Sequence, residues 1–235
     1  MPAYDLARAL LRPPLRGGLG WRVDGLEHIP GSGPALLAAN HISLADPPAV
    51  GYLADLRARE ARFLATSGLF RYPVLAGLLR RMGQIPVERA TSRAVDSLAP
   101  AAAALHAGEV VVIFPEGGLS ANLEPGRGRT GVARLARAAG LPVIPVGLWG
   151  THRLHAKHHG FRWRPGLVVA AAIGRGITLR PDEDDRAATD RIMDTIAGRV
   201  ATARLLYGEK VPPGEEAWWS RHRRAQAKRA SSERT

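Results

Sequence analysis

The sequence predicts an α/β fold, with one domain built on a mostly parallel central sheet flanked by helices. Short apolar runs rich in β-formers alternate with longer helical segments, which is the pattern of strands joined by crossover helices. The 235 residues are enough for one such domain with its own core. A hydrophobic content of 46% with 23% charged residues is ordinary for a globular protein, so a largely disordered chain is excluded.

The first half of the chain opens with a short predicted helix at residues 4–11, which has leucines on one side and arginines nearby. Pro13 and Pro14 break the apolar stretch after it, because proline lacks the N–H that a helix interior needs. A helix should begin near Pro47, since proline suits a first turn. The other elements expected here are strands at 21–27, 35–39, 62–65 and 84–87, a turn at 30–34 and a helix at 69–82.

The clearest strand of the second half is residues 110–114, which begin with four consecutive β-formers. Gly108 closes an alanine-rich helix at 93–106 before it, and Gly140 ends a helix at 130–139 after it. Strands at 143–148 and 167–173 and a long helix at 186–207 follow. We therefore divide the chain into an N-terminal helical element (1–20), the main domain (21–208) and a basic, loosely ordered tail (209–235).

The two ends of the chain have features of a membrane interface. The N-terminal helix is amphipathic, and it either lies in such an interface or packs on the domain. In the tail, Trp218 and Trp219 precede a run of basic residues, which suits either an interfacial anchor or a solvated segment. No apolar run approaches the roughly 20 residues of a spanning helix, and the first residues lack the layout of a signal peptide. We expect a peripheral protein on the cytoplasmic face of the cell membrane.

The charge balance indicates a polyanionic partner. A formal net charge of +12 fits nucleic acid, an anionic membrane surface or a phosphorylated substrate. No nucleic-acid motif accompanies the charge, so nucleic acid is not expected. The chain has no cysteine, which excludes thiolate metal sites and a cysteine nucleophile. Four histidines between residues 152 and 159 are interleaved with Arg and Lys and have no nearby carboxylate, so we expect no metal.

Three polar clusters follow predicted strands, where the sites of open α/β sheets form. His41 precedes Asp46 by five residues, so the carboxylate can fix the tautomer of a histidine base, although such a pair can also be structural. Arg89 follows the strand at 84–87 and can bind a phosphate or form a surface salt bridge. Glu116 and Gly117 follow the buried strand, which suits hydrogen bonding to a substrate hydroxyl or a structural role.

Taken in order, these three clusters and a fourth segment, residues 143–146, resemble the four motifs of the glycerolipid acyltransferases typified by 1-acylglycerol-3-phosphate O-acyltransferase. The resemblance covers roughly residues 20–175. Each motif is short, but four in the right order make a chance match improbable. The matches are N-H-x-x-x-x-D at residues 40–46, G-x-I-x-V-x-R at 83–89, F-P-E-G at 114–117 and V-x-P-V at 143–146.

The resemblance implies a role for each matching residue. It implies His41 as general base and Asp46 as its orienting partner. It places Arg89 on the acceptor phosphate, with Glu116 and Gly117 in the acceptor site. Three further residues are expected to support the site: Asn40, Ser43 and Arg129.

The implied reaction moves a fatty acyl group from acyl-CoA or acyl-carrier protein to the free hydroxyl of 1-acylglycerol-3-phosphate, with no cofactor. Where the family often continues F-P-E-G with Thr-Arg-Ser, this chain has Gly118, Leu119 and Ser120. The missing arginine leaves the acceptor open, so glycerol 3-phosphate or another lysolipid is an alternative to this lysophospholipid. A second alternative is a basic, non-catalytic protein that binds membranes or nucleic acid.

Overall fold

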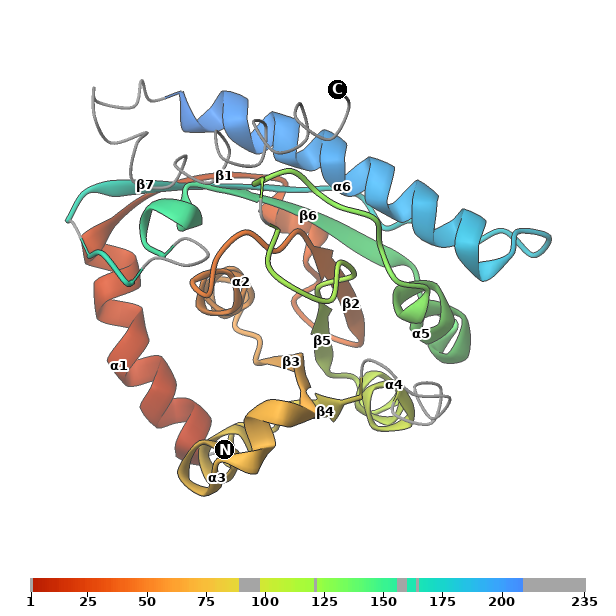
Figure 1. Cartoon of the computed structure of the whole chain (residues 1–235), viewed down its shortest axis with the longest axis horizontal. Coiled ribbons are helices and arrows are strands. Elements are labelled where there is room, and N and C mark those ends of the chain that lie inside the picture. The colour runs from red at the N-terminus through yellow and green to blue at the C-terminus, as the bar shows by residue number, and fades with distance from the viewer. Residues whose placement is uncertain (1, 89–97, 121, 156–159, 164, 209–235) are drawn as a thin grey trace, which may run out of the picture.

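The computed structural model describes residues 2–88, 98–120, 122–155, 160–163 and 165–208. Their centre is a seven-stranded sheet in the order β1-β7-β6-β2-β5-β3-β4 (Figure 1). The strands are β1 (Leu19–Asp24), β2 (Ala35–Ala39), β3 (Ala61–Thr66), β4 (Ile85–Val87), β5 (Val110–Ile113), β6 (Val143–Trp149) and β7 (Leu167–Ile173). All neighbours are parallel except β6 and β7, which confirms the predicted mostly parallel sheet.

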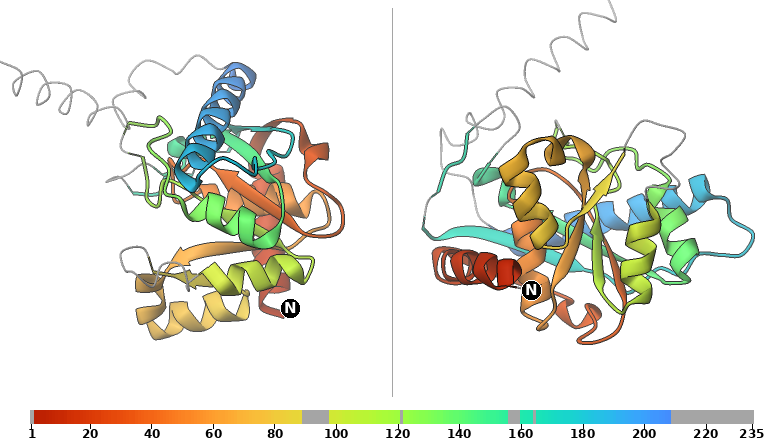
Figure 2. Two further views of the ribbon diagram at one scale, coloured as in Figure 1. Left: turned by 90° about the vertical axis from the view of Figure 1, so that its right-hand side faces the viewer. Right: turned by 90° about the horizontal axis from the view of Figure 1, so that it is seen from below.

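Helices cover both faces of the sheet (Figure 1). Among the described residues, the α-helices are α1 (Pro2–Gly18), α2 (Asp46–Asp55), α3 (Pro73–Arg81), α4 (Ala99–His106), α5 (Gly131–Ala139) and α6 (Asp185–Tyr207), and the short 3-10 turns are η1 (Leu26–His28), η2 (Ser67–Arg71) and η5 (Thr151–Arg153). The left view of Figure 2 has α6 at the top of the molecule and α3 at the bottom. No helix among the described residues is long and apolar enough to cross a membrane.

The core lies in two layers, one on each face of the sheet. Successive side chains of a strand point to opposite faces, so Leu36 packs with the side chains of α4, α5 and α6, while Leu37 packs with those of α2. Helix α6 crosses β6 so closely that a Cβ on Gly147 would lie 2.2 Å from the carbonyl carbon of Arg199. This close approach requires glycine.

The N-terminal helix differs from the prediction. It is one helix, Pro2–Gly18, with Pro13 and Pro14 inside it, rather than a helix confined to residues 4–11. The two prolines are exposed, so water can bind the backbone carbonyls that they leave without an N–H partner. Contacts with the domain hold the helix on either side of this point. The Tyr4 hydroxyl accepts the Ala61 N–H at 3.0 Å, and Leu15 O accepts the Trp21 indole N–H at 2.6 Å.

Other boundaries differ less. Strand β1 begins at Leu19 and ends at Asp24, because the next residue, Gly25, has a left-handed φ of 71° that leads into η1. The predicted helix at 69–82 is divided into η2 and α3, which meet at Tyr72 before Pro73. A residue before proline disfavours the α conformation, which explains the break. The first residues of the predicted helix at 93–106 and the whole tail, 209–235, lie outside the described residues.

Candidate active site

The loop between β2 and α2 brings His41 and Asp46 together. His41 Nδ1 lies 2.9 Å from Asp46 Oδ2, and the same oxygen accepts the backbone N–H groups of Ile42 and Ser43, each at 2.7 Å. Asp46 is the first residue of α2 and is fully buried. One carboxylate oxygen therefore fixes both the imidazole and the backbone that carries it.

This geometry leaves one nitrogen of His41 free to act as a base. A carboxylate oxygen accepts hydrogen bonds, so Nδ1 carries the ring proton and Nε2 has the lone pair. The side chain of His41 is 12% exposed, and the ring lies in the wall of a cavity. The arrangement is that of a general base with an orienting acid.

Two residues predicted to support the site fix the ends of this loop. The buried Asn40 side chain donates to Leu148 O at 3.1 Å and accepts the Leu148 N–H at 2.7 Å, which ties the end of β2 to β6. The Ser43 hydroxyl accepts the Ala45 N–H at 2.9 Å inside the loop. Both side chains bond to backbone groups, so they hold the loop rather than face a substrate.

Glu116 lies beside His41 because parallel β2 and β5 are neighbours and end at the same edge of the sheet. Its Oε1 accepts the His41 N–H at 2.8 Å and its Oε2 accepts the Gly126 N–H at 3.2 Å. Burial raises the pKa of the Glu116 carboxyl, and the two backbone hydrogen bonds oppose that rise. The site thus includes a residue 75 positions from His41 in the chain.

Gly117, predicted in the acceptor site, lies next to Arg129, predicted to support the site, while Arg89 cannot be placed. Gly117 has a left-handed φ of 71°, and a Cβ there would lie 2.6 Å from Arg129 Nε. The backbone N–H of Arg129 donates to Pro115 O at 2.8 Å, which holds this exposed arginine beside the turn. Arg89 lies outside the described residues.

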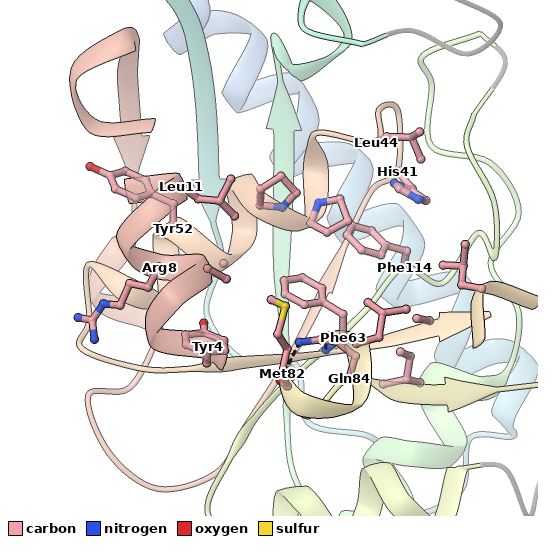
Figure 3. A pocket seen from close by; sticks show the side chains of 18 of the residues that line it. Tyr4, Arg8, Leu11, His41, Leu44, Tyr52, Phe63, Met82, Gln84 and Phe114 are labelled. Carbon is pink, nitrogen blue, oxygen red and sulfur yellow. Dashed lines mark hydrogen bonds between the residues drawn. The ribbon is translucent and has the colours of Figure 1, made fainter. Parts of the chain in front are cut away.

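An apolar cavity of about 540 Å³ opens beside His41 (Figure 3). Its walls come from α1, α2, β3, η2 and α3, and Phe114 lies next to His41 at one side of it. The side chains lining it are mostly apolar, and they include Leu11, Leu15 and Phe63. A cavity of this size and character suits an apolar ligand with its reactive end at the histidine.

Comparison with known proteins identifies the family. A model of the family described as "Acyltransferase" matches residues 20–149, more than half of the chain. The chain belongs to the acyltransferase family. This confirms the resemblance drawn from the four motifs.

Individual members of the family cover parts of the chain. The chain is 31% identical over 134 residues to the chloroplastic 1-acyl-sn-glycerol-3-phosphate acyltransferase LPAT1 of Arabidopsis thaliana, covering 56% of this chain and 36% of that protein. It is 29% identical over 158 residues to a 1-acyl-sn-glycerol-3-phosphate acyltransferase of Borreliella burgdorferi, covering 66% of this chain and 62% of that protein. The chain thus spans little more than a third of the plant relative.

One solved acyltransferase has the same fold. The crystal structure of the 1-acyl-sn-glycerophosphate (LPA) acyltransferase PlsC from Thermotoga maritima superposes with a TM-score of 0.67, and the match covers 89% of this chain and 80% of that one. The sequence identity is 22%, so this likeness concerns the fold.

The structure adds site residues of this family member that sequence reasoning missed. The Phe114 ring stacks on the His41 ring with centroids 4.2 Å apart, and the backbone N–H of Ser120 donates to His41 O at 2.7 Å. Phe114 belongs to a recognised motif, but no pattern signals a contact made through the backbone of Ser120. Among the residues described, no three His, Asp or Glu side chains gather into a group that could hold a metal ion.

Proposed function

We propose that this acyltransferase moves a fatty acyl group from a thioester of coenzyme A or acyl carrier protein to the free hydroxyl of 1-acylglycerol-3-phosphate, which gives phosphatidic acid. The observation that carries the proposal is the apolar cavity that reaches the His41–Asp46 pair. The cavity can hold an acyl chain while its carbonyl lies near the base. The names of the plant and Borreliella burgdorferi relatives support the choice of acceptor.

The proposed reaction follows from the position of the base. His41 Nε2 takes the proton of the acceptor hydroxyl, and the oxygen attacks the thioester carbonyl carbon. The C–S bond then breaks, and the thiolate takes the proton from the imidazolium and leaves as a thiol. General-base catalysis of this kind contributes about 10²–10⁴-fold. Asp46 keeps the imidazole in the required tautomer and stabilises its protonated form.

Binding of the acceptor phosphate is assigned to Arg89, from the sequence motif, and to the turn at Gly117 and Arg129. The guanidinium group of Arg129 lies beside this turn and can bind a phosphate. Leu119 occupies the position at which relatives often have arginine, and its side chain lines the apolar cavity. This difference supports acceptors other than those of relatives that have the arginine. Leu119 adds apolar surface where a charge would bind the acceptor. Glycerol 3-phosphate and other lysolipids are therefore the alternatives to include in a test.

Thiol release tests the reaction directly. Wild type and His41→Ala are given palmitoyl-coenzyme A and a thiol-reactive dye, with 1-acylglycerol-3-phosphate, glycerol 3-phosphate, another lysolipid or no acceptor. The absence of cysteine removes the background reaction of the protein with the dye. We expect acceptor-dependent release that His41→Ala lowers by at least 10²-fold, while His106→Ala, an exposed histidine on α4, retains it. Equal release by wild type and His41→Ala would refute the assignment of the base.

We further propose that the face formed by α1, η2 and α3 binds an anionic membrane. Helices α1 and α3 contact one another, and their outer sides expose large apolar residues around the cavity walls. These residues are Leu6, Leu10, Leu69, Tyr72, Val74 and Leu78. Exposed arginines at 71, 80 and 81 lie among them and can bind lipid headgroups. An acyl chain could then reach the cavity from the bilayer.

Vesicle sedimentation tests this face. A Leu10→Ser, Val74→Ser variant loses two of its most exposed apolar side chains, which are 67% and 90% exposed. Binding to vesicles of phosphatidylcholine with phosphatidylglycerol should weaken at least tenfold, since each large apolar side chain contributes about 1.5–3 kcal/mol when fully buried. Leu205→Ser is the matched control, because this leucine is 83% exposed on α6. Equal binding by both variants would refute the proposal.

A further inference from the structure

Glu116 touches the backbone of the proposed base, although its motif suggests a residue that binds the acceptor. Both carboxylate oxygens are engaged: Oε1 with the His41 N–H at 2.8 Å and Oε2 with the Gly126 N–H at 3.2 Å. The residue is partly buried at the edge of the sheet. Its carboxylate therefore joins the loop that carries His41 to the loop that follows β5.

The loop after β5 holds His41 at two further points. The N–H of Ser120 donates to His41 O at 2.7 Å, so the N–H and the carbonyl of His41 are both fixed from this loop. The ring of Phe114 stacks on the imidazole at 4.2 Å with an interplanar angle of 21°. Asp46 fixes the rotation of the imidazole ring through the hydrogen bond with Nδ1. The imidazole is thus fixed in position and in tilt.

The charge of Glu116 argues against direct contact with the acceptor headgroup. A carboxylate repels a phosphate, and each oxygen of this carboxylate already accepts a backbone N–H group. If the side chain turned toward the acceptor headgroup, it would leave a partly buried N–H without a partner, which costs about 1–3 kcal/mol. The two hydrogen bonds therefore hold the carboxylate against the backbone.

We propose that Glu116 is a positioning residue, which acts on the reaction by holding the His41 backbone against the loop after β5. The inference rests on the proposed function, because it assigns Glu116 a part in the same reaction. It predicts that loss of Glu116 lowers turnover and leaves acceptor binding intact. A misplacement of the base by about 1 Å can cost on the order of 10²-fold in rate.

Steady-state kinetics with varied acceptor separates the two roles. Glutamine has one acceptor oxygen, and its NH₂ group would face the second backbone N–H, so Glu116→Gln should lower kcat about tenfold. Alanine has no side-chain acceptor, so Glu116→Ala should lower kcat about 10²-fold. The KM for the acceptor should stay within about twofold in both. Glu124→Gln makes the same exchange on the same loop, at a residue that pairs with Arg204, and should retain wild-type kcat. An acceptor KM raised more than tenfold with kcat unchanged would overturn the proposal.

The background of His41→Ala distinguishes positioning from general loss of structure. If Glu116 acts through His41, Glu116→Gln should not lower the residual thiol release of His41→Ala further. A further tenfold fall in that background would mean that Glu116 acts independently of the base, which contradicts the proposal.

Amide hydrogen exchange of His41 gives a readout that does not depend on turnover. The His41 N–H, now bonded to Glu116, should exchange at least tenfold faster in Glu116→Ala, while amides of β5 keep their protection. Unchanged protection of the His41 amide would overturn the inference. If wild type releases no thiol but this exchange still accelerates, the proposed function has failed and the positioning contact stands.

Discussion

Replacing Asp46 by asparagine removes a negative charge from His41 and keeps the shape of the side chain. Asp46 Oδ2 accepts three N–H groups, and Oδ1 is a buried oxygen with no hydrogen-bond partner among the described residues. An asparagine carbonyl can therefore occupy the position of Oδ2, with its NH₂ at the position of Oδ1. The opposite orientation would place a donor against three donors. The variant should fold with the loop intact.

The cost of this change falls on the transition state, in which the imidazole becomes positively charged. A hydrogen bond to a charged group is worth about 1.5–3 kcal/mol. Losing that interaction should lower kcat/KM by roughly 10- to 150-fold, because each 1.36 kcal/mol is a factor of ten. Asp46→Ala should lose more, since it also leaves the N–H groups of Ile42 and Ser43 without their acceptor.

Thiol release by four proteins tests this reasoning: wild type, Asp46→Asn, His41→Ala and the double variant. Because Asp46 acts through His41, the double variant should be as slow as His41→Ala alone. Asp190→Asn, an exposed aspartate paired with Arg186, is the control for loss of one negative charge and should be fully active. If the two site substitutions multiplied their effects, the catalytic pairing of Asp46 with His41 would be refuted.

Two other predictions concern the cavity and the core. Outside its own helix, a Cβ on Gly51 would meet only Phe63 among the described residues within 4 Å, at 3.8 Å, so Gly51→Leu should fill part of the cavity. The ratio of rates with octanoyl- and palmitoyl-coenzyme A should rise, and an unchanged ratio would argue against acyl binding there. Burial lowers the pKa of His152 from 6.5 to about 3, so the unfolded chain binds the proton first as the pH falls. Between pH 7.5 and pH 5.5, the free energy of unfolding should therefore drop by about 1.4 kcal/mol. Urea titrations at the two pH values measure this drop. The His152→Gln variant should not show it, whereas His106→Gln should.

The sequence alone predicted the pairing of His41 with Asp46, because the hydrogen bonds that Asp46 accepts are local. His41, Ser43 and Asp46 lie within six residues, and a carboxylate at a helix start readily accepts the N–H groups of the preceding turn. The sheet was equally readable, since buried strands such as β5 are short runs of β-formers bounded by turn residues. The family followed from the order of the motifs.

Only the tertiary structure decided the features that depend on distant segments. Helix α1 continues through Pro13 and Pro14, because its contacts with the domain outweigh the local preference of proline for ending a helix. A sequence pattern reports only the local preference. The cavity exists because α1 and α3, far apart in the chain, form two of its walls. Glu116 is the sharpest case: its motif names the residue, but its bond to the His41 N–H arises only when β2 and β5 lie side by side. Two residues that are 75 positions apart produce no periodic pattern in the sequence when they meet in space. The hydrogen-bond partners of Glu116 could therefore be identified only in the folded chain.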